Sequence, residues 1–218
     1  SAAYATLDWT ATVSSDDTAA SGTLTVASGQ TSTTFNVPVL ADSVYETGNE
    51  TVTITLSNST NATISDSTGI LTITDDDNAP TVTLTSSASS VAENGSDLTL
   101  TATLSNATTA DVSVGISTSG TGTEGTDYAT VSDITISAGS TTGTAAFNPT
   151  DDSVYEGDET GVIAIDTVSG GGATENSTPQ AVTLTISENE SAPTVSLSST
   201  ATTVYDNGSN ITFTATST

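Results

Sequence analysis

Residues 98–104 read LTLTATL, so that leucine or alanine alternates with threonine at every position. In an extended chain, successive side chains point to opposite faces, and the pattern therefore gives one apolar face and one hydroxyl face. Threonine suits the outer face because its β-branched side chain fits a pleated surface. The stretch predicts a strand that is buried on one side only.

The same period-two pattern recurs along the whole chain. It is found at residues 35–39, 51–56, 71–73, 112–116 and 182–186. No stretch has a convincing helical periodicity, and Gly, Asn, Asp and Ser residues separate the short runs. These features predict an all-β protein built of tandem antiparallel, immunoglobulin-like β-sandwiches with about seven strands each.

An acidic loop is repeated about one small domain further along the chain. Residues 42–51 read DSVYETGNET, and residues 152–160 read DSVYEGDET. Each copy is followed by an alternating run and then by a second acidic cluster, DDD at 75–77 and ENE at 188–190. The repeat predicts tandem domains that carry equivalent acidic ends.

A second repeat sets the predicted domain boundaries. APTVTL at 79–84 and APTVSL at 192–197 each follow directly after an acidic cluster. We therefore divide the chain into residues 1–78, 79–190 and 191–218. The first part is a domain without its first two strands, the second is a complete domain, and the third is the first two strands of another domain.

Two explanations are open for the partial domains at the ends. In one, the chain is a window of a longer covalent array. In the other, each copy donates its last two strands to complete the first domain of the next copy, head to tail. Exposed edges on a truncated sandwich are costly, which favours the covalent array. Both explanations predict a filament or stalk whose neighbours are identical domains or subunits.

The composition excludes several classes of function. The 218 residues include no Lys, Arg, His, Cys or Met, and the net charge is −26. Nucleic acids require cationic side chains, anionic membranes would repel the chain, and no apolar run approaches the roughly 20 residues of a spanning helix. Bases and nucleophiles supplied by His, Lys or Cys are lacking, so we expect no enzymatic activity. We expect a secreted, extracellular or cell-surface protein in which calcium takes the place of disulfides.

Repeated carboxylates with no Lys or Arg to neutralise them indicate a cation site. Two carboxylates about 5 Å apart repel each other by roughly 3 kcal/mol at an effective dielectric constant of 20. Calcium prefers about six to eight oxygen ligands, whereas magnesium demands a stricter octahedron. Acidic loops are commonly just solvated, but their recurrence at matching positions favours calcium sites.

Four motifs resemble those of the Calx-β domain family. They are VAENG at 91–95, GTDY at 125–128, the acidic loop at 151–160 and ENE at 188–190. The resemblance implies an immunoglobulin-like sandwich that binds calcium in its distal loops, beside the next domain. The family occurs in sodium–calcium exchangers and in many bacterial surface arrays.

The resemblance also implies a set of calcium ligands. In the second domain these are Glu93, Asp127, Asp151, Asp152, Glu156, Glu159, Glu188 and Glu190. In the first domain they are Asp17, Asp42, Glu46, Glu50, Asp75, Asp76 and Asp77. In the partial third domain, Asp206 stands where Glu93 stands. The first loop departs from the pattern at Ala41 and at an extra Thr47, so we expect the two copies to differ in ion number or affinity.

These features predict a structural role, as a calcium-stiffened segment of a surface filament, stalk or adhesin shaft. Two other classes stay open. A calcium-sensing regulatory module would have tuned, non-identical domains beside a membrane region. A ligand-binding adhesin tip would need an exposed aromatic site or an inserted loop. A hydrolase with an acidic pair is a third alternative, but sugar sites usually carry aromatic platforms and aromatic residues make up only 4% of the chain.

Overall fold

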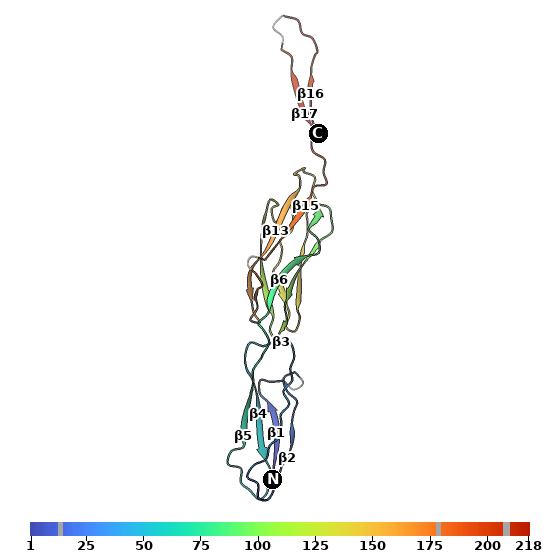
Figure 1. The fold of residues 1–218 in the computed structure, drawn as a ribbon. Coiled ribbons are helices and arrows are strands. Elements are labelled where there is room, and N and C mark those ends of the chain that lie inside the picture. Colours follow the sequence, from blue (N-terminus) through green and yellow to red (C-terminus); the bar gives the residue numbers. More distant parts are fainter. Residues whose placement is uncertain (13–14, 178–179, 207–209) are drawn as a thin grey trace.

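A computed structural model describes residues 1–12, 15–177, 180–206 and 210–218. Its parts follow one another along a long axis in chain order, with the N-terminus at one end and a two-stranded hairpin at the other (Figure 1). Every regular element among the described residues is a strand, so the all-β prediction is confirmed. Within these residues, nothing forms a helix of the length and hydropathy that crossing a membrane requires.

The second domain is a sandwich of two sheets. One sheet has the order β11-β10-β13-β15-β7, with the bounds Ile134–Ile136, Val112–Gly120, Glu159–Ser169, Ala181–Ser187 and Ser90–Ala92. The facing sheet has the order β12-β8-β6-β14, with the bounds Thr142–Phe147, Leu98–Leu104, Thr81–Ser86 and Thr174–Glu175. Neighbouring strands are antiparallel, except that the short edge strands β7 and β14 pair in parallel with β15 and β6.

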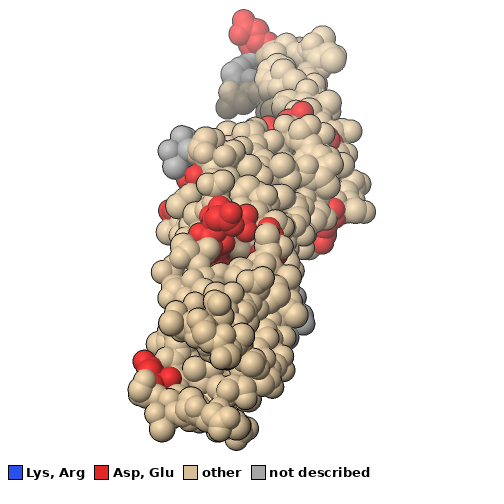
Figure 2. Space-filling model, turned by 60° about the horizontal axis from the view of Figure 1, so that its bottom comes forward, with Lys and Arg blue, Asp and Glu red and all other residues tan. Residues whose placement is uncertain are grey.

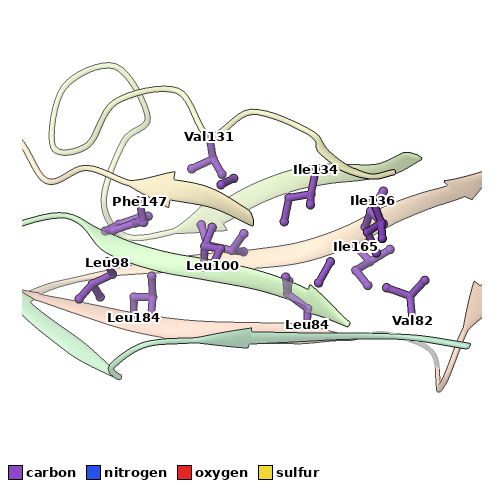
Figure 3. Close-up of a cluster of buried hydrophobic side chains, with 14 of the residues drawn as sticks. Val82, Leu84, Leu98, Leu100, Val131, Ile134, Ile136, Phe147, Ile165 and Leu184 are labelled. Carbon is purple, nitrogen blue, oxygen red and sulfur yellow. The ribbon is translucent and has the colours of Figure 1, made fainter. Parts of the chain in front are cut away.

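The alternating runs bury their apolar side between these two sheets. In β8, Leu98, Leu100, Ala102 and Leu104 are buried, and the threonines between them are exposed or half-buried. Figure 3 shows leucines of this strand facing aliphatic side chains of the opposite sheet. Each fully buried leucine or isoleucine stabilises the fold by about 1.5–3 kcal/mol. The core therefore holds the loops at both ends of the sandwich in fixed positions.

The first domain has only one sheet in the described chain. Its order is β2-β1-β4-β5, with the bounds Ser21–Leu24, Ala2–Asp8, Glu50–Ser57 and Thr68–Ile73. It corresponds to β11-β10-β13-β15 of the second domain, and no described residue of 1–78 supplies a counterpart of β6 or β8. As a result, Ala11 and Val52 are the buried hydrophobic residues of this domain.

The C-terminal hairpin stands apart from the second domain. Its strands are β16 (Val195–Ser199) and β17 (Phe213–Ser217), and all residues of both strands are exposed. They pair only with each other. In the ribbon, the hairpin extends away from the second domain at the end opposite the first domain (Figure 1).

The first two domains are joined by more than the chain between them. β3 (Val44–Tyr45) of the first domain pairs in parallel with β9 (Ala107–Thr108) of the second. The backbone N–H of Thr109 donates to the carbonyl oxygen of Tyr45 at 3.3 Å. The acidic loop at 42–51 therefore reaches across the junction and contacts the next domain directly.

Candidate metal centres

The acidic residues of the second domain gather at one end of its sandwich. They come from the turn after β7, the loop after β10, the loop before β13 and the end of β15. Three sets of carboxylates have oxygens within 4.8 Å of one another. The sets are Glu93 with Asp152 and Glu156, Glu93 with Glu188 and Glu190, and Asp127 with Glu156 and Glu159. Because Glu93 and Glu156 are shared between sets, these seven carboxylates form one continuous cluster rather than scattered surface charges.

Backbone donors hold Glu188 at the centre of this cluster. Its Oε2 accepts hydrogen bonds from the N–H groups of Glu156 at 2.6 Å and Gly157 at 2.9 Å, and its Oε1 accepts one from Glu190 at 2.9 Å. These N–H groups favour the charged carboxylate and lower the pKa of Glu188 to about 2. The loop before β13 is thereby fastened to the end of β15.

Glu93 has the opposite environment. It is 6% exposed, although it is charged when ionised. Burial, followed by the negative charges of Glu188 and Glu190, raises the pKa of Glu93 to about 7. Glu156, Glu159 and Glu190 also have raised pKa values; burial is the first cause for Glu156 and Glu159, and a hydrogen bond with Glu188 for Glu190. The raised pKa values mean that, without a cation, ionising these carboxylates in the folded protein costs free energy.

The first domain repeats the arrangement at its junction with the second. Asp16, Glu46 and Glu50 have oxygens within 4.8 Å of one another. Burial, followed by a hydrogen bond with Asp16, raises the pKa of Glu50 to about 7. A cavity of about 300 Å³ adjoins this group, and Asp42, Asp75, Asp76 and Asp77 also line it. In the space-filling view, acidic side chains gather about halfway along the visible face, near the level where the two domains meet (Figure 2).

Asp75 takes the role in the first domain that Glu188 takes in the second. Its Oδ2 accepts a hydrogen bond from the N–H of Glu46 at 3.1 Å, and its Oδ1 accepts one from the N–H of Asp77 at 3.2 Å. Burial, followed by the charges of Asp75 and Asp76, raises the pKa of Asp77. The two acidic loops are therefore fastened in the same way to the residues just after β5 and β15.

Comparison with known families decides what these repeated sandwiches are. The model of the Calx-beta domain matches residues 1–77 and again residues 75–190. The chain belongs to the Calx-beta domain family. The membership rests on this sequence match, which extends over most of the chain. Among curated proteins, none matches it.

Solved structures of Calx domains are similar to the chain at low identity. The apo-form Calx CBD1 domain is 21% identical, covers 50% of this chain and 98% of its own, and has a TM-score of 0.42. The CBD12 structure from CALX1.2 is 22% identical, with coverages of 77% and 67% and a TM-score of 0.37. The calcium binding domain CBD12 of CALX1.1 is 18% identical, with coverages of 81% and 69% and a TM-score of 0.34.

In the first Calx-beta domain, the structure brings Asp16 rather than Asp17 into the carboxylate group. Oδ2 of Asp16 accepts a hydrogen bond from the N–H of Thr12, as Oδ2 of Asp127 does from Thr123. An ungapped alignment misses this match because the two Calx-beta domains differ by one residue between this loop and the acidic loop. The shared pattern of a Thr four residues before an Asp is the signal that could have found Asp16.

Asp17 lies in the interior instead. It is 0% exposed, and neither of its carboxylate oxygens has a hydrogen-bond partner. Its backbone forms an isolated β-bridge with Val39. At the equivalent position of the second Calx-beta domain, Tyr128 forms a β-bridge with Pro149. Burial is the first cause that raises the pKa of Asp17, followed by the charges of Asp8 and Asp16.

Asp42, Asp151 and Asp206 lie outside the carboxylate sets, whereas Asp152 belongs to one of them. Asp151 is exposed, and its Oδ1 accepts a hydrogen bond from Nδ2 of Asn189 at 3.0 Å. Asp42 and Asp152 each accept a hydrogen bond from a backbone N–H two residues further on. Asp206 is exposed in the C-terminal hairpin, outside both clusters.

The donor set fits a hard divalent cation. It consists of carboxylate oxygens, with no nitrogen or sulfur ligand in the chain. Oε2 of Glu50 and Oε2 of Glu190 are buried and have no hydrogen-bond partner. Buried charges are normally paired with an opposite charge or with a metal, and this chain has no Lys or Arg to pair with them. Calcium, a hard cation that takes about six to eight oxygen ligands, fits such an all-oxygen donor set.

Proposed function

We propose that the chain is a calcium-stiffened structural segment of an extracellular or cell-surface filament, stalk or adhesin shaft. The observation that carries the proposal is the position of the first acidic cluster. Glu46 follows directly after Tyr45, which pairs with the second domain, and Asp75 to Asp77 directly precede the connection between the domains. The carboxylates of this cluster therefore belong to the junction between the first and second domains.

Asp16, Glu46 and Glu50 would hold the ion in the first domain, with Asp42, Asp75 and Asp77 around it. Calcium would supply the positive charge that turns the repulsion among these carboxylates into shared coordination. Asp75 already binds the N–H of Glu46, so the loop and the end of β5 are held together. Because this loop also carries β3, fixing it fixes the angle between the two domains.

The proposal gives the protein no catalytic role. Its composition supports this, since His, Lys and Cys are absent and carboxylates, hydroxyls and tyrosines are left as reactive groups. An extracellular location is consistent with calcium at high concentration, at which modules of modest affinity are saturated.

Thermal unfolding in calcium and in chelator, with magnesium as a control, tests the proposal. Calcium at about 100 times its dissociation constant adds roughly 2.7 kcal/mol per site, which raises Tm by about 10 °C for a domain of this size. Glu50→Gln should reduce the shift, whereas Asp166→Asn, an equal charge change at an exposed position on β13, should leave it intact. Absence of a calcium-specific shift in Tm would show that the clusters are solvated acidic loops and not metal sites.

Small-angle scattering tests the stiffening itself. The maximum dimension of the chain should be sharply defined in calcium and should spread in chelator, because the junction between the two domains loosens. A chain that stays equally straight in both conditions contradicts the stiffening role while leaving calcium binding intact.

A further inference from the structure

Three large apolar side chains lie exposed on the outer side of the first domain. Trp9, which directly follows β1, is 79% exposed and is the single tryptophan of the chain. Leu7 of β1 and Ile70 of β5 are 63% and 74% exposed. Both lie opposite Thr53 of β4 in their ladders, so these residues form one row across the sheet. Large apolar side chains that gather on a surface commonly mark an interaction site.

The outer side of this sheet is open in the second domain as well. Three residues after the start of β13, as after the start of β4, the row across the sheet consists of Ser119, Val162 and Thr183. The two rows have the same order of exposure, which is exposed, half-buried and exposed. The facing sheet of the second domain packs on the other side of these ladders, where Ile163 is buried. The exposure of the row in the first domain therefore does not depend on which strands lie on its inner side.

The turn after β1 has one residue more than the turn after β10. Thr10 and Thr121 take the same place, because the hydroxyl oxygen of each accepts a backbone N–H of the neighbouring strand, at 2.8 Å and 2.9 Å. β1 and β10 also end at the same ladder position. Gly120, the end of β10, is joined directly to Thr121, whereas Trp9 lies between the end of β1 and Thr10. The second domain closes this turn without such a residue, so the fold does not require a tryptophan here.

The extra tryptophan borders the acidic cluster of the first domain. Its backbone N–H donates to the carbonyl oxygen of Thr51 at 3.3 Å, and Thr51 directly follows Glu50 of the cluster. Asp16 and Glu46 complete the cluster, and four more aspartates line the cavity beside it. The formal charge of these seven carboxylates exceeds that of two calcium ions. This end of the domain therefore stays negative even with calcium bound.

We propose that Trp9, Leu7 and Ile70 form a docking site for a protein segment that carries Lys or Arg. Charge complementarity favours such a partner, because the chain has a net charge of −26 and would repel a second copy of itself. The chain also has no Lys or Arg of its own to place over the ring. Of the aromatic side chains, tryptophan makes the most favourable cation–π contact with Lys or Arg.

The spacing of the site calls for a segment of several residues. Neighbouring strands are about 4.8 Å apart, so Leu7 and Ile70, which are two strands apart, are separated by roughly 10 Å. One cationic side chain can place its charge on Trp9 and its aliphatic stem along the apolar row, and neighbouring residues of the segment cover the rest. The site uses none of the clustered carboxylates as a direct ligand, so it does not depend on the calcium role.

Fluorescence of Trp9 tests the docking directly, because no other tryptophan contributes to the emission. The probe is a short peptide with blocked ends in which Arg alternates with Leu, and its control has Gln in place of each Arg. The titration is made in calcium at about 0.15 M salt, at which exposed charges are screened beyond about 8 Å. The Arg peptide should change the emission of Trp9 and saturate, and the Gln peptide should bind at least about tenfold more weakly.

Four variants locate the contact, with binding followed by the anisotropy of a labelled Arg peptide. Trp9→Ala should weaken binding by at least about tenfold, and Trp9→Phe by about threefold. Leu7→Ser with Ile70→Thr introduces the residues of the second domain and should weaken binding by about threefold without lowering Tm. Tyr155→Ala removes an exposed ring beside the second acidic loop and should leave the affinity unchanged.

Three results would overturn the proposal. Equal affinities of wild type and Trp9→Ala would show that the peptide is held by the acidic surface in general. A response of Trp9 to cellohexaose that exceeds its response to the Arg peptide would make the site a sugar site. Self-association of the protein alone that Trp9→Ala abolishes would make a second copy the partner. If calcium fails to raise Tm while Trp9→Ala still weakens peptide binding, the calcium role fails and the docking site stands.

Discussion

The loops at 42–51 and 152–160 have nearly the same sequence but opposite surroundings. In the first, Val44 and Tyr45 are half-buried and pair with β9 of the next domain. In the second, Val154 and Tyr155 are 56% and 45% exposed. Both loops are nevertheless fastened by a carboxylate further along the chain, Asp75 just after β5 or Glu188 just after β15.

The difference shows that the fastening of the loop within its own domain does not depend on a contact with another domain, because Glu188 holds the exposed second loop as Asp75 holds the docked first loop. The complementary surface in the second domain is β9 together with the glycine turn at 170–172. A Cβ atom at Gly172 would lie 2.5 Å from Cε1 of Tyr45, so the ring packs directly against the glycine backbone. The clustered carboxylates and the docking residues are therefore neighbours in sequence with separate partners.

Closing the space at Gly172 should give the largest effect. Gly172→Ala should destabilise the chain by about 3 kcal/mol, because the methyl group displaces Tyr45 and strains a residue at φ 65°. Gly157→Ala is the matched control in the free loop: its φ is 83° and nothing lies within 4 Å, so it should cost about 1 kcal/mol. Denaturant unfolding measures both, and equal losses contradict the steric fit.

Removing the docked ring should have the next largest effect. Tyr45→Ala should cost about 2 kcal/mol, since a half-buried aromatic side chain loses its contacts with the next domain. Tyr155→Ala should stay within about 0.5 kcal/mol, as for other exposed residues. Combining Tyr45→Ala with Gly172→Ala should be less than additive, because both changes act on one contact. Additive losses would place Tyr45 and Gly172 in independent environments.

Amide exchange should distinguish the loops with a smaller effect. Chelation of calcium should speed exchange at residues 154–157 at least about threefold, since repulsion among the freed carboxylates opens the loop. Residues 44–46 should change less, because β3 is still paired with β9. The comparison is made by mass spectrometry of the same sample with and without chelator, and an equal response in the two loops counts against the protection by docking.

The smallest effect concerns pH in the absence of calcium. Glu50 and Glu93 have pKa values raised to about 7, above the 4.5 of an unfolded glutamate. The folded chain therefore holds protons that the unfolded chain releases, and stability should fall as pH rises from about 5 to above 7. Glu188, with its pKa lowered to about 2, acts in the opposite sense below about pH 4.5. A calcium-free Tm that rises steadily from pH 5 to 8 contradicts this assignment.

The sequence predicted most of the strands because their pattern is local, but the alternating run at 35–39 forms no strand and has only an isolated bridge at Val39. Alternation in residues 98–104 determines which side of β8 is buried, and the turns between runs separate the elements. The two acidic clusters were also predictable, since equal motifs at equal places in two domains lead to equal geometry. Asp16 was missed because one residue shifts the register of a loop that has no alternation to guide it.

The junction could not be predicted from sequence. Pairing of Val44–Tyr45 with Ala107–Thr108 joins residues far apart in the chain, and two-residue strands leave no periodic signal. The contact of Tyr45 with Gly172 depends on the shape of a turn in another domain. The parallel edge strands β7 and β14 are equally short, and their direction follows from the path of the chain around the sandwich.

The direction of the strands has a mechanical consequence. In Figure 1 the long strands of both domains run close to the long axis of the molecule, and β10 and β13 are paired over eight residue pairs. A pull on the two ends of the molecule loads such a ladder in shear, so that its hydrogen bonds share the force and must break together. Tensile strength should therefore depend on ladder length more than on core size, which suits a protein with so few large side chains to bury.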